Sequence, residues 1–587
     1  MGQFEKLKKF EIRENFYLDG KPFQIISGAI HYFRIVPEYW KDRLEKLKAM
    51  GCNTVETYIP WNVHEPEKGE FHFEGMWDIQ KFVKIAEELE LYVILRPSPY
   101  ICAEWEFGGL PAWLLREDDM RLRASCGSFL LHVEEYYQVL LPLITPLQIT
   151  EGGPVILMQI ENEYGYYAND KAYMEAIKNL MVKGGVKVPL VTSDGPFPEN
   201  LNAGAMEGIL PTGNFGSRTE ERFEVLRRYT DGGPLMCTEF WVGWFDHWGN
   251  GGHITRDPEE SAKDLDKMLE LGHVNIYMFE GGTNFGFMNG ANYYDRLTPD
   301  VTSYDYDALL TEDGQITEKY LRYRQVISKY REIPKITLSS KIERKAYGTL
   351  MVQDKVNLLS VLDDLSSPIV SACTECMEKL GQNYGYILYH STLDTEENME
   401  RIRLWGANDR ANILVDEKPV AILYDRELLE ERDVSVTFEK GAALDILVEN
   451  MGRVNFGPRM EMQRKGISQC VQINGHIHNN WKQYKLPLDH MDGIDFSKGY
   501  EEGVPAFYRF IFSAEEAGDT FLDFAGWGKG VAFINGFNLG RFWKIGPQKR
   551  LFIPAPLIKK GKNEIVIFET DGITGNTISL VNEPDVG

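Results

Sequence analysis

The chain has 587 residues, too many for one hydrophobic core, and its 43% hydrophobic and 12% aromatic content is typical of a folded globular protein. Its 88 acidic and 63 basic side chains give a formal net charge of −25, which repels phosphate backbones and anionic lipid. Nucleic acid and membrane surfaces are therefore poor partners for this chain, and a neutral small substrate fits better.

The N-terminal residues lack the apolar core of a signal peptide, and no stretch approaches the length of a transmembrane helix. The seven cysteines are odd in number and scattered, which suits a reducing compartment. These features predict a cytoplasmic protein. Cys373 and Cys376 form a CxxC pair, but no second Cys or His pair lies at metal-site spacing, so we interpret them as ordinary thiols.

Up to about residue 330, short apolar stretches alternate with amphipathic helical patterns. One helix is expected at 37–51, where Pro37 opens it and Gly51 ends it. Eight such β-to-α steps predict a parallel (β/α)8 barrel. A doubly wound open sheet is the weaker alternative, because no glycine-rich phosphate turn follows the first strand. The expected strands are 23–30, 54–59, 91–97, 154–160, 188–193, 208–213, 234–240 and 274–279.

After about residue 335 the pattern changes to short alternating segments separated by turn dipeptides. The segments 411–424 and 530–543 share one design, an apolar strand, a tight turn, a second apolar strand and an aromatic end. Such hairpins in two places predict two β-sandwiches of jelly-roll type, which we expect to dock against the barrel. The expected domains are a barrel at 1–330, a first β-sandwich at 331–450 and a second β-sandwich at 451–587.

The carboxyl ends of the strands carry the chemistry in a (β/α)8 barrel. At these ends the sequence places isolated carboxylates among aromatic and carboxamide side chains, without the clustered basic residues or glycine cradle of a phosphate site. Aromatic rings stack on the apolar faces of pyranoses, while Asn and Glu bind sugar hydroxyls. The pattern therefore predicts a sugar site.

Hydrolysis of a glycoside requires two carboxyl groups, one that donates a proton and one that attacks the anomeric carbon. Glu163 and Glu239 follow the fourth and seventh predicted strands. Opposed strand ends could hold their carboxyls about 5–5.5 Å apart, the separation of a retaining mechanism. From the residues alone two questions stay open: both groups could be surface or ion-paired glutamates, and Glu161 is a carboxylate equivalent to Glu163.

The segments GGPVILMQIENEYG, WKDRLEKLKAMG, ETYIPWNVHEP, RPSPYICAEWEFGGLPAWLL, EFWVGWFDHWG and GGTNFGFMNGAN resemble glycoside hydrolase family 35, the β-galactosidases. Together with TSYDYDALLTEDGQITEKY they are distributed over residues 40–320, and ENMGRVNFGP and GWGKGVAFINGFNLGRFW resemble the β domains of the family. The resemblance implies a retaining β-galactosidase of the bacterial, intracellular type that uses no metal and no organic cofactor. It also implies that 1–330 is the catalytic barrel and that the second β-sandwich at 451–587 is a galactose-binding-like domain.

The resemblance also implies roles for single residues. Glu163 would be the proton donor, Glu239 the nucleophile, and Asn162 a ligand of the sugar 2-hydroxyl. Because side chains alternate along a strand, Asn162 and Glu163 can both face the sugar only if the backbone bends or bulges there, and Glu161 is then a supporting neighbour whose own face stays open. Positions that hold the galactose ring in the family correspond to Tyr58, Cys102, Ala103, Glu104, Tyr277 and Tyr306.

Trp241 stands where some members of the family carry a tyrosine. With Trp244 it could form an aromatic wall for the sugar beyond galactose, or the two rings could simply pack against the barrel rim. Phe456 takes a position that is often tyrosine, so a polar contact is lost there. For His64 and His247 we favour structural hydrogen bonding over catalysis or metal ligation.

We therefore expect an exo-β-galactosidase that releases terminal β-D-galactose from small oligosaccharides, with a preference for β-1,3 linkages of the galactosyl-N-acetylglucosamine type. A broad-specificity β-galactosidase or a transgalactosylase is one alternative. A non-catalytic carbohydrate-binding protein is another, although the presence of both glutamates argues against it. A homodimer is compatible with the sequence, since the sandwiches could form an oligomer interface.

Overall fold

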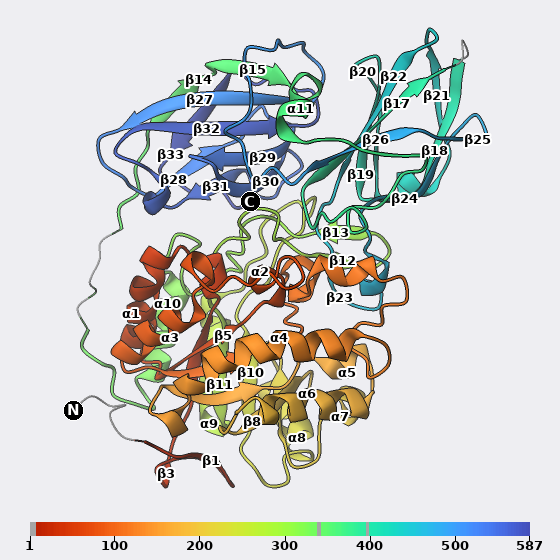
Figure 1. The fold of residues 1–587 in the computed structure, drawn as a ribbon. Coiled ribbons are helices and arrows are strands. Elements are labelled where there is room, and N and C mark those ends of the chain that lie inside the picture. The colour runs from red at the N-terminus through yellow and green to blue at the C-terminus, as the bar shows by residue number, and fades with distance from the viewer. Residues whose placement is uncertain (1–6, 337, 339–341, 395–397) are drawn as a thin grey trace.

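A computed structural model describes residues 7–336, 338, 342–394 and 398–587. The N-terminal part is a closed barrel of eight parallel strands, which confirms the predicted (β/α)8 fold. Both β-sandwiches lie on one side of this barrel (Figure 1). The barrel strands are β4 (Ile26–Ile30), β5 (Thr54–Tyr58), β6 (Tyr92–Arg96), β7 (Val155–Gln159), β8 (Leu190–Asp194), β9 (Leu210–Asn214), β10 (Met236–Trp241) and β11 (His273–Glu280).

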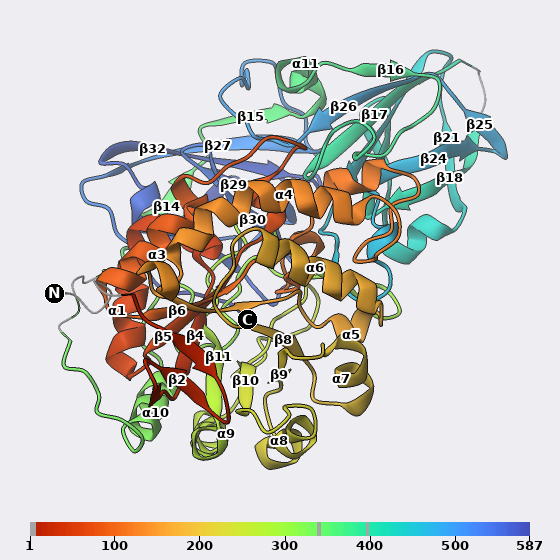
Figure 2. The ribbon, with the colours of Figure 1, turned by 60° about the horizontal axis from the view of Figure 1, so that its bottom comes forward.

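Helices surround these strands, as the turned view in Figure 2 shows. Their apolar faces and the almost completely buried strands form one continuous hydrophobic core. In the described part of the chain, no helix is both long and apolar enough to cross a membrane. The longer barrel helices are α1 (Trp40–Met50), α3 (Ile79–Glu88), α4 (Phe129–Ile144), α6 (Lys171–Lys183), α7 (Pro198–Gly204), α8 (Thr219–Arg227), α9 (Pro258–Leu271) and α10 (Glu318–Ile327).

Helix α1 ends at Gly51 as predicted but begins at Trp40, three residues after the predicted start. Pro37 opens a short 3-10 turn that leads into the helix, and Gly51 caps its C-terminus with a left-handed φ of 113°. A Cβ atom at Gly51 would come within 2.6 Å of Ile333 and 2.8 Å of Ile327. Both the backbone conformation and the space therefore require glycine at this position.

Each β-sandwich consists of two packed sheets around its own apolar core. The first has a six-stranded sheet of order β16-β26-β17-β22-β19-β20 and a four-stranded sheet β21-β18-β24-β25. Its strands are β16 (Ile369–Ser371), β17 (Tyr386–Leu393), β18 (Asn398–Asn408), β19 (Arg410–Val415), β20 (Lys418–Tyr424), β21 (Arg432–Thr437), β22 (Ala442–Glu449), β24 (Gly466–Ile473), β25 (His476–His478) and β26 (Trp481–Leu486).

The second sandwich pairs a five-stranded sheet of order β15-β27-β32-β29-β30 with a four-stranded sheet β14-β33-β28-β31. Both predicted hairpins are present, β19–β20 and β29–β30, each with a two-residue turn of positive φ. The strands of this sandwich are β14 (Gly348–Met351), β15 (Asp354–Asn357), β27 (Ala506–Ala514), β28 (Thr520–Asp523), β29 (Lys529–Ile534), β30 (Phe537–Trp543), β31 (Arg550–Ile553), β32 (Gly561–Glu569) and β33 (Thr577–Val581).

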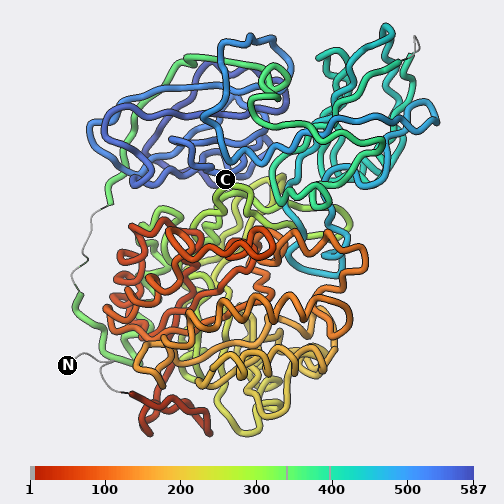
Figure 3. Tube along the Cα trace, in the orientation of Figure 1, coloured from red at the N-terminus to blue at the C-terminus, as the bar shows by residue number. Residues whose placement is uncertain are grey.

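The two sandwiches do not follow each other along the chain. Strands β14 and β15, which come directly after the barrel, pair with β33 and β27 of the second sandwich. Strands β24 and β26, which lie beyond residue 450, pair with β18 and β17 of the first. The first sandwich is thus inserted into the second, as the chain trace in Figure 3 shows, and it extends across the expected boundary at residue 450. Alternating residues identify a strand but not its distant partner.

A small three-stranded sheet joins the first sandwich to the barrel. Strand β23 (Val454–Phe456) pairs in parallel with β12 (Ala291–Tyr293), which in turn pairs with β13 (Leu297–Pro299). Strands β12 and β13 belong to the long segment after β11, whereas β23 lies between β22 and β24 of the first sandwich. These three strands lie between the barrel and the first sandwich (Figure 1), so the first sandwich docks against the barrel as expected.

Candidate active site

A cavity of about 260 Å³ is built from the carboxyl ends of the barrel strands and the loops that follow them. Every predicted site residue except Tyr58 lines it: Cys102, Ala103, Glu104, Asn162, Glu163, Glu239, Trp241, Trp244, Tyr277 and Tyr306. The remaining lining residues are Phe456, which the sequence also singled out, and four that it did not, Tyr166, Phe245, Asn292 and Tyr294.

The end of β7 has the irregular backbone that the sequence requires. The strand ends at Gln159, and Glu161 and Glu163 both adopt left-handed φ angles, 56° and 47°. Residues other than glycine rarely adopt this backbone conformation, which costs energy and occurs most often at functional sites. Because the alternation of the strand is broken here, Asn162 and Glu163 both line the cavity.

Glu161 is turned away from the cavity and fully occupied. The Arg123 guanidinium donates to both of its carboxylate oxygens, at 2.9 and 2.8 Å, and the Tyr173 hydroxyl donates to Oε1 at 2.7 Å. Both partners of this ion pair are buried. Glu161 is therefore a supporting neighbour of the site, as expected, and its side chain is held by Arg123 and Tyr173 and does not line the cavity.

Arg123→Met is expected to lower the free energy of unfolding of the barrel by about 3–5 kcal/mol, because it leaves the buried Glu161 carboxylate without its counterion. Chemical denaturation followed by tryptophan fluorescence measures the change. The matched control is Lys187→Met, which breaks the exposed ion pair with Glu151 and should cost less than about 1 kcal/mol. Equal effects of the two substitutions would contradict the structural role of Arg123.

Glu163 is held as a protonated acid near neutral pH. Burial, together with the nearby charge of Glu239, raises the pKa of Glu163 to about 8. Its Oε1 atom accepts a hydrogen bond of 3.0 Å from Asn214 Nδ2, a neutral donor. A carboxyl group in these surroundings can give up a proton to a leaving group.

Glu239 lies in the opposite environment. Its Oε1 atom accepts from Arg96 Nη2 and from the Tyr58 hydroxyl, each at 2.7 Å, and its Oε2 atom accepts from Trp241 Nε1 at 3.1 Å. A guanidinium and two further donors stabilise the ionised carboxylate, which is the nucleophilic form. Tyr58, the one predicted site residue outside the cavity lining, thus supports Glu239 from within the barrel.

Arg96 connects Glu239 to a second carboxyl group deeper in the barrel. Its Nη1 atom lies 3.4 Å from Glu56 Oε1, and Asn275 Nδ2 donates to the other oxygen of Glu56 at 3.2 Å. Burial raises the pKa of Glu56 to about 7, while Arg96 opposes this shift. The sequence analysis missed both residues, although a charged residue inside an otherwise apolar barrel strand is itself a signal of a buried ion pair.

Asn162 presents a hydrogen-bond donor to the cavity. Its Oδ1 atom already accepts from Arg96 Nη2 at 2.5 Å and Gln159 Nε2 at 3.1 Å, and it lies 3.0 Å from the Tyr58 hydroxyl, whose one proton points to the nearer oxygen of Glu239. Its Nδ2 atom makes only a long contact of 3.5 Å with the Ile101 carbonyl. Since the oxygen is saturated, the amide nitrogen is the group available to a ligand.

The loop after β6 supplies the next part of the wall. Cys102, Ala103 and Glu104 are three consecutive residues with left-handed φ angles of 59°, 56° and 49°. Arg34 Nη2 donates to the Ala103 carbonyl at 2.5 Å, and the Tyr304 hydroxyl donates to the Glu104 carboxylate. Burial raises the pKa of Glu104 to about 7. This strained turn places a carboxyl group and backbone atoms at the cavity surface.

Strand β23 completes the cavity from the side of the first sandwich. Phe456 lines the cavity and meets the Tyr166 ring edge-on, with 5.8 Å between ring centroids. Asn455 Nδ2 contacts the Cys102 Sγ atom at 3.6 Å, and its carbonyl accepts from the Tyr100 hydroxyl at 2.5 Å. The site is therefore shared between the barrel and the segment that leaves the sandwich.

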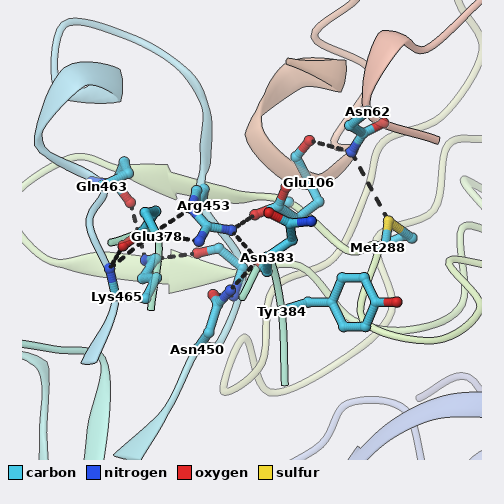
Figure 4. Close-up of polar contacts among 12 residues, drawn as sticks. Asn62, Glu106, Met288, Glu378, Asn383, Tyr384, Asn450, Arg453, Gln463 and Lys465 are labelled. Carbon is cyan, nitrogen blue, oxygen red and sulfur yellow. Dashed lines mark hydrogen bonds and ion pairs between the residues drawn. The ribbon is translucent and has the colours of Figure 1, made fainter. Parts of the chain in front are cut away.

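Behind this wall, a buried arginine that pairs with two glutamates joins the barrel to the first sandwich (Figure 4). Arg453 Nη1 donates to Glu106 Oε1 of the barrel at 2.6 Å, and Nη2 donates to Glu378 Oε1 of the first sandwich at 2.5 Å. The Lys465 backbone N–H also donates to Glu378. The loop that carries Glu104 and the strand that carries Phe456 thus share one buried polar network.

The mouth of the cavity is aromatic. Trp241 and Trp244 pack edge-to-face with 5.4 Å between ring centroids, and Trp244 remains 37% exposed. Tyr294 is 70% exposed on the same cavity. The two tryptophans therefore pack against each other at the rim and still line the cavity, and the Trp241 indole serves as a donor to Glu239.

The two histidines of the motif segments have structural partners. His64 is buried, and its ring nitrogens contact the Tyr32 hydroxyl at 2.5 Å and the His72 carbonyl at 2.7 Å. Burial lowers the pKa of His64 to about 4, so the ring is neutral. His247 Nε2 lies 2.9 Å from Asn292 Oδ1. Among the residues that the structure describes, no group of three or more His, Cys, Asp and Glu side chains could hold a metal ion.

Comparison with known proteins agrees with this architecture. The family model "Glycosyl hydrolases family 35" matches residues 15–330, "Beta-galactosidase, first all-beta domain" matches 375–487, and "Beta-galactosidase, galactose-binding domain" matches 505–563. The chain is 40% identical to human "Beta-galactosidase-1-like protein 2", over 98% of this chain and 91% of the relative. Mouse "Beta-galactosidase" is also 40% identical, over 95% and 91%, and "Beta-galactosidase 17" of Arabidopsis thaliana is 40% identical, over 97% and 88%.

Proposed function

The chain belongs to glycosyl hydrolases family 35 and is a β-galactosidase, and from this premise we propose that it acts by a retaining double displacement with Glu239 as nucleophile and Glu163 as acid and base. The observation that carries the proposal is the contrast between two carboxyl groups in one cavity. Glu163 has a pKa raised to about 8 and a neutral amide donor, whereas Glu239 is paired with Arg96.

In the first step a Glu239 oxygen attacks the anomeric carbon while Glu163 gives its proton to the leaving oxygen. The glycosidic bond breaks, and an ester between galactose and Glu239 forms. In the second step the Glu163 carboxylate takes a proton from water, the water oxygen attacks the same carbon, and Glu239 leaves. The amide nitrogen of Asn162, which makes only the long contact with the Ile101 carbonyl, suits a hydrogen bond to the sugar 2-hydroxyl that strengthens in the transition state.

The pKa of Glu163 predicts the alkaline limit of activity. Because the first step requires the protonated acid, kcat/KM for an aryl β-galactoside should stay level at neutral pH and fall as the pH rises through about 8. A pH profile of initial rates at low substrate concentration measures this limb. A limb near the ordinary glutamate value of about 4.3 would contradict a raised pKa in the free enzyme.

We further propose a preference for β-1,3-linked galactosides, supported by the aromatic rim of Trp241 and Trp244. Initial rates on β-1,3-, β-1,4- and β-1,6-linked disaccharides should be highest for the β-1,3 linkage. Trp244→Ala removes a stacking face worth about 1 kcal/mol, so it should lower the β-1,3 rate by roughly five-fold. Trp405→Ala, on the first sandwich, is the control and should leave the ratios between the rates on the three linkages unchanged. Equal wild-type rates on all three linkages would refute the preference.

The exposed Trp244 ring also favours a second candidate activity, transfer of galactose to a sugar acceptor instead of water. Product analysis at high substrate concentration separates the two, because transfer yields oligosaccharides longer than the substrate. We also propose a cytoplasmic location, which is supported by the seven cysteines, all of them free, because a reducing compartment keeps thiols unpaired.

A further inference from the structure

We propose that Asn214 is a positioning residue that determines which oxygen of Glu163 carries the transferable proton. The inference rests on the proposed acid and base role of Glu163. Asn214 is the last residue of β9, lies opposite Glu239 in the register of β10, and is only 1% exposed. It belongs to none of the motif segments that the sequence analysis singled out.

The hydrogen bonds of Asn214 fix the orientation of its amide. The Ser193 hydroxyl at the end of β8 donates to Asn214 Oδ1 at 2.6 Å. The amide nitrogen faces Glu163 and donates to Oε1 at 3.0 Å, which is the orientation that an ionised carboxylate requires, because it can only accept. The Ser193 carbonyl also accepts from the Glu163 backbone N–H at 2.9 Å. Ser193 therefore holds both the backbone of Glu163 and the amide that contacts its side chain.

This arrangement selects one oxygen of the acid. Oε1 receives the amide hydrogen, so a proton on the same oxygen would compete with that bond, and the transferable proton resides on Oε2. Without Asn214 the carboxyl group could rotate and present the wrong oxygen to the leaving group. Such a rotation of the carboxyl group would slow the reaction, because proton transfer requires hydrogen-bond geometry between the acid and the leaving oxygen.

The neutral charge of Asn214 matters as much as its position. Glu161 is paired with Arg123 and Glu239 with Arg96. A positive charge at such a distance favours the charged form of a carboxyl group. Glu163 must instead alternate between a protonated and an ionised form during each turnover. An amide donor favours the ionised form only weakly, so it can orient the carboxyl group in both states.

The experiment compares two substrates for the variant Asn214→Ala. Dinitrophenyl β-galactoside has a leaving group that needs no proton, whereas methoxyphenyl β-galactoside needs one. Because kcat/KM reports the steps up to cleavage of the glycosidic bond, we expect a loss of about 10- to 100-fold for the methoxyphenyl substrate and less than about three-fold for the dinitrophenyl one. The alkaline limb of the methoxyphenyl profile should also move to higher pH, because the amide hydrogen bond lowers the pKa of Glu163.

Ser193→Ala should show the same substrate pattern with a smaller loss, and the double variant should be no worse than Asn214→Ala alone, because Ser193 acts through the amide. Thr192→Val is the matched control, since among the described residues the Thr192 hydroxyl has no hydrogen-bond partner and the side chain lies at the same depth in β8. It should leave both substrates unchanged.

Equal losses on the two substrates, or an unmoved alkaline limb, would overturn the role of Asn214 and reduce it to a packing residue. Failure of the proposed function would look different. If Glu163 is not the acid, its removal cannot matter more for the substrate that needs a proton. The ratio of kcat/KM for the dinitrophenyl and methoxyphenyl substrates would then be the same in Glu163→Ala as in the wild type.

Discussion

Glu239→Gln is expected to lower kcat for an aryl β-galactoside by about four orders of magnitude, equivalent to about 5.4 kcal/mol on the barrier. An amide has the shape of the carboxylate but cannot attack the anomeric carbon. Its oxygen can still accept from Arg96 and Tyr58, so the cavity should keep its form. Steady-state rates with protein of verified mass, free of deamidated enzyme, measure the loss.

A trapping experiment tests the same assignment directly. A 2-fluoro galactoside with a good leaving group should label the wild-type enzyme, and peptide mass spectrometry should place the sugar on Glu239. Glu151→Gln, at an exposed ion pair outside the cavity, is the matched control and should keep full activity and full labelling. Undiminished turnover of Glu239→Gln, or a label on another carboxylate, would exclude Glu239 as the nucleophile.

Glu163→Ala is expected to have the second largest effect, and the effect should depend on the leaving group. For substrates that require protonation, loss of general acid catalysis should cost about 10²- to 10⁴-fold in kcat/KM, whereas dinitrophenyl β-galactoside should be cleaved at a nearly normal rate. The galactosyl ester on Glu239 should then accumulate, because no base activates the water. Pre-steady-state measurements should show a burst of dinitrophenolate followed by slow turnover.

Added azide should restore breakdown of this intermediate, since it needs no general base and the shorter side chain leaves room for it. Two inversions at the anomeric carbon give β-galactosyl azide as the product. Proton NMR distinguishes the two anomers. Formation of the α-azide would mean a single inversion without an ester on Glu239 and would contradict the double displacement. An absence of any rescue would argue against a role of Glu163 in the second step.

The sequence predicts the barrel well because the relevant signal is local. Apolar runs such as 91–97 and 154–160, each followed by a helical pattern, produce the parallel strands β6 and β7 in the expected order. The site residues on the strand ends were found for a different reason, the resemblance of their motifs to one family. The bend after Gln159 was predicted by combining the strand pattern with this resemblance, since alternation alone would have put Asn162 and Glu163 on opposite faces.

The contacts that the sequence could not provide are those between distant segments. Nothing in the motif around Glu161 and Glu163 reveals that Arg123 binds the first and Asn214 the second. The chain between β14 and β33 gives no local sign that these strands pair, because a strand pattern does not encode its partner. The same limit concealed the partners of Arg96, because each carboxylate that it binds is far from it in the sequence.

The insertion of the first sandwich has a consequence for the order of events during synthesis of the chain. The barrel strands are complete once β11 has been made, yet the wall of the cavity awaits β23, which emerges only after most of the first sandwich. Because domains fold from the N-terminus as they leave the ribosome, a nascent barrel should exist for a time with its cavity open on one side. Hydrolytic activity should thus mature late, and it marks the moment at which the sandwich has folded and docked.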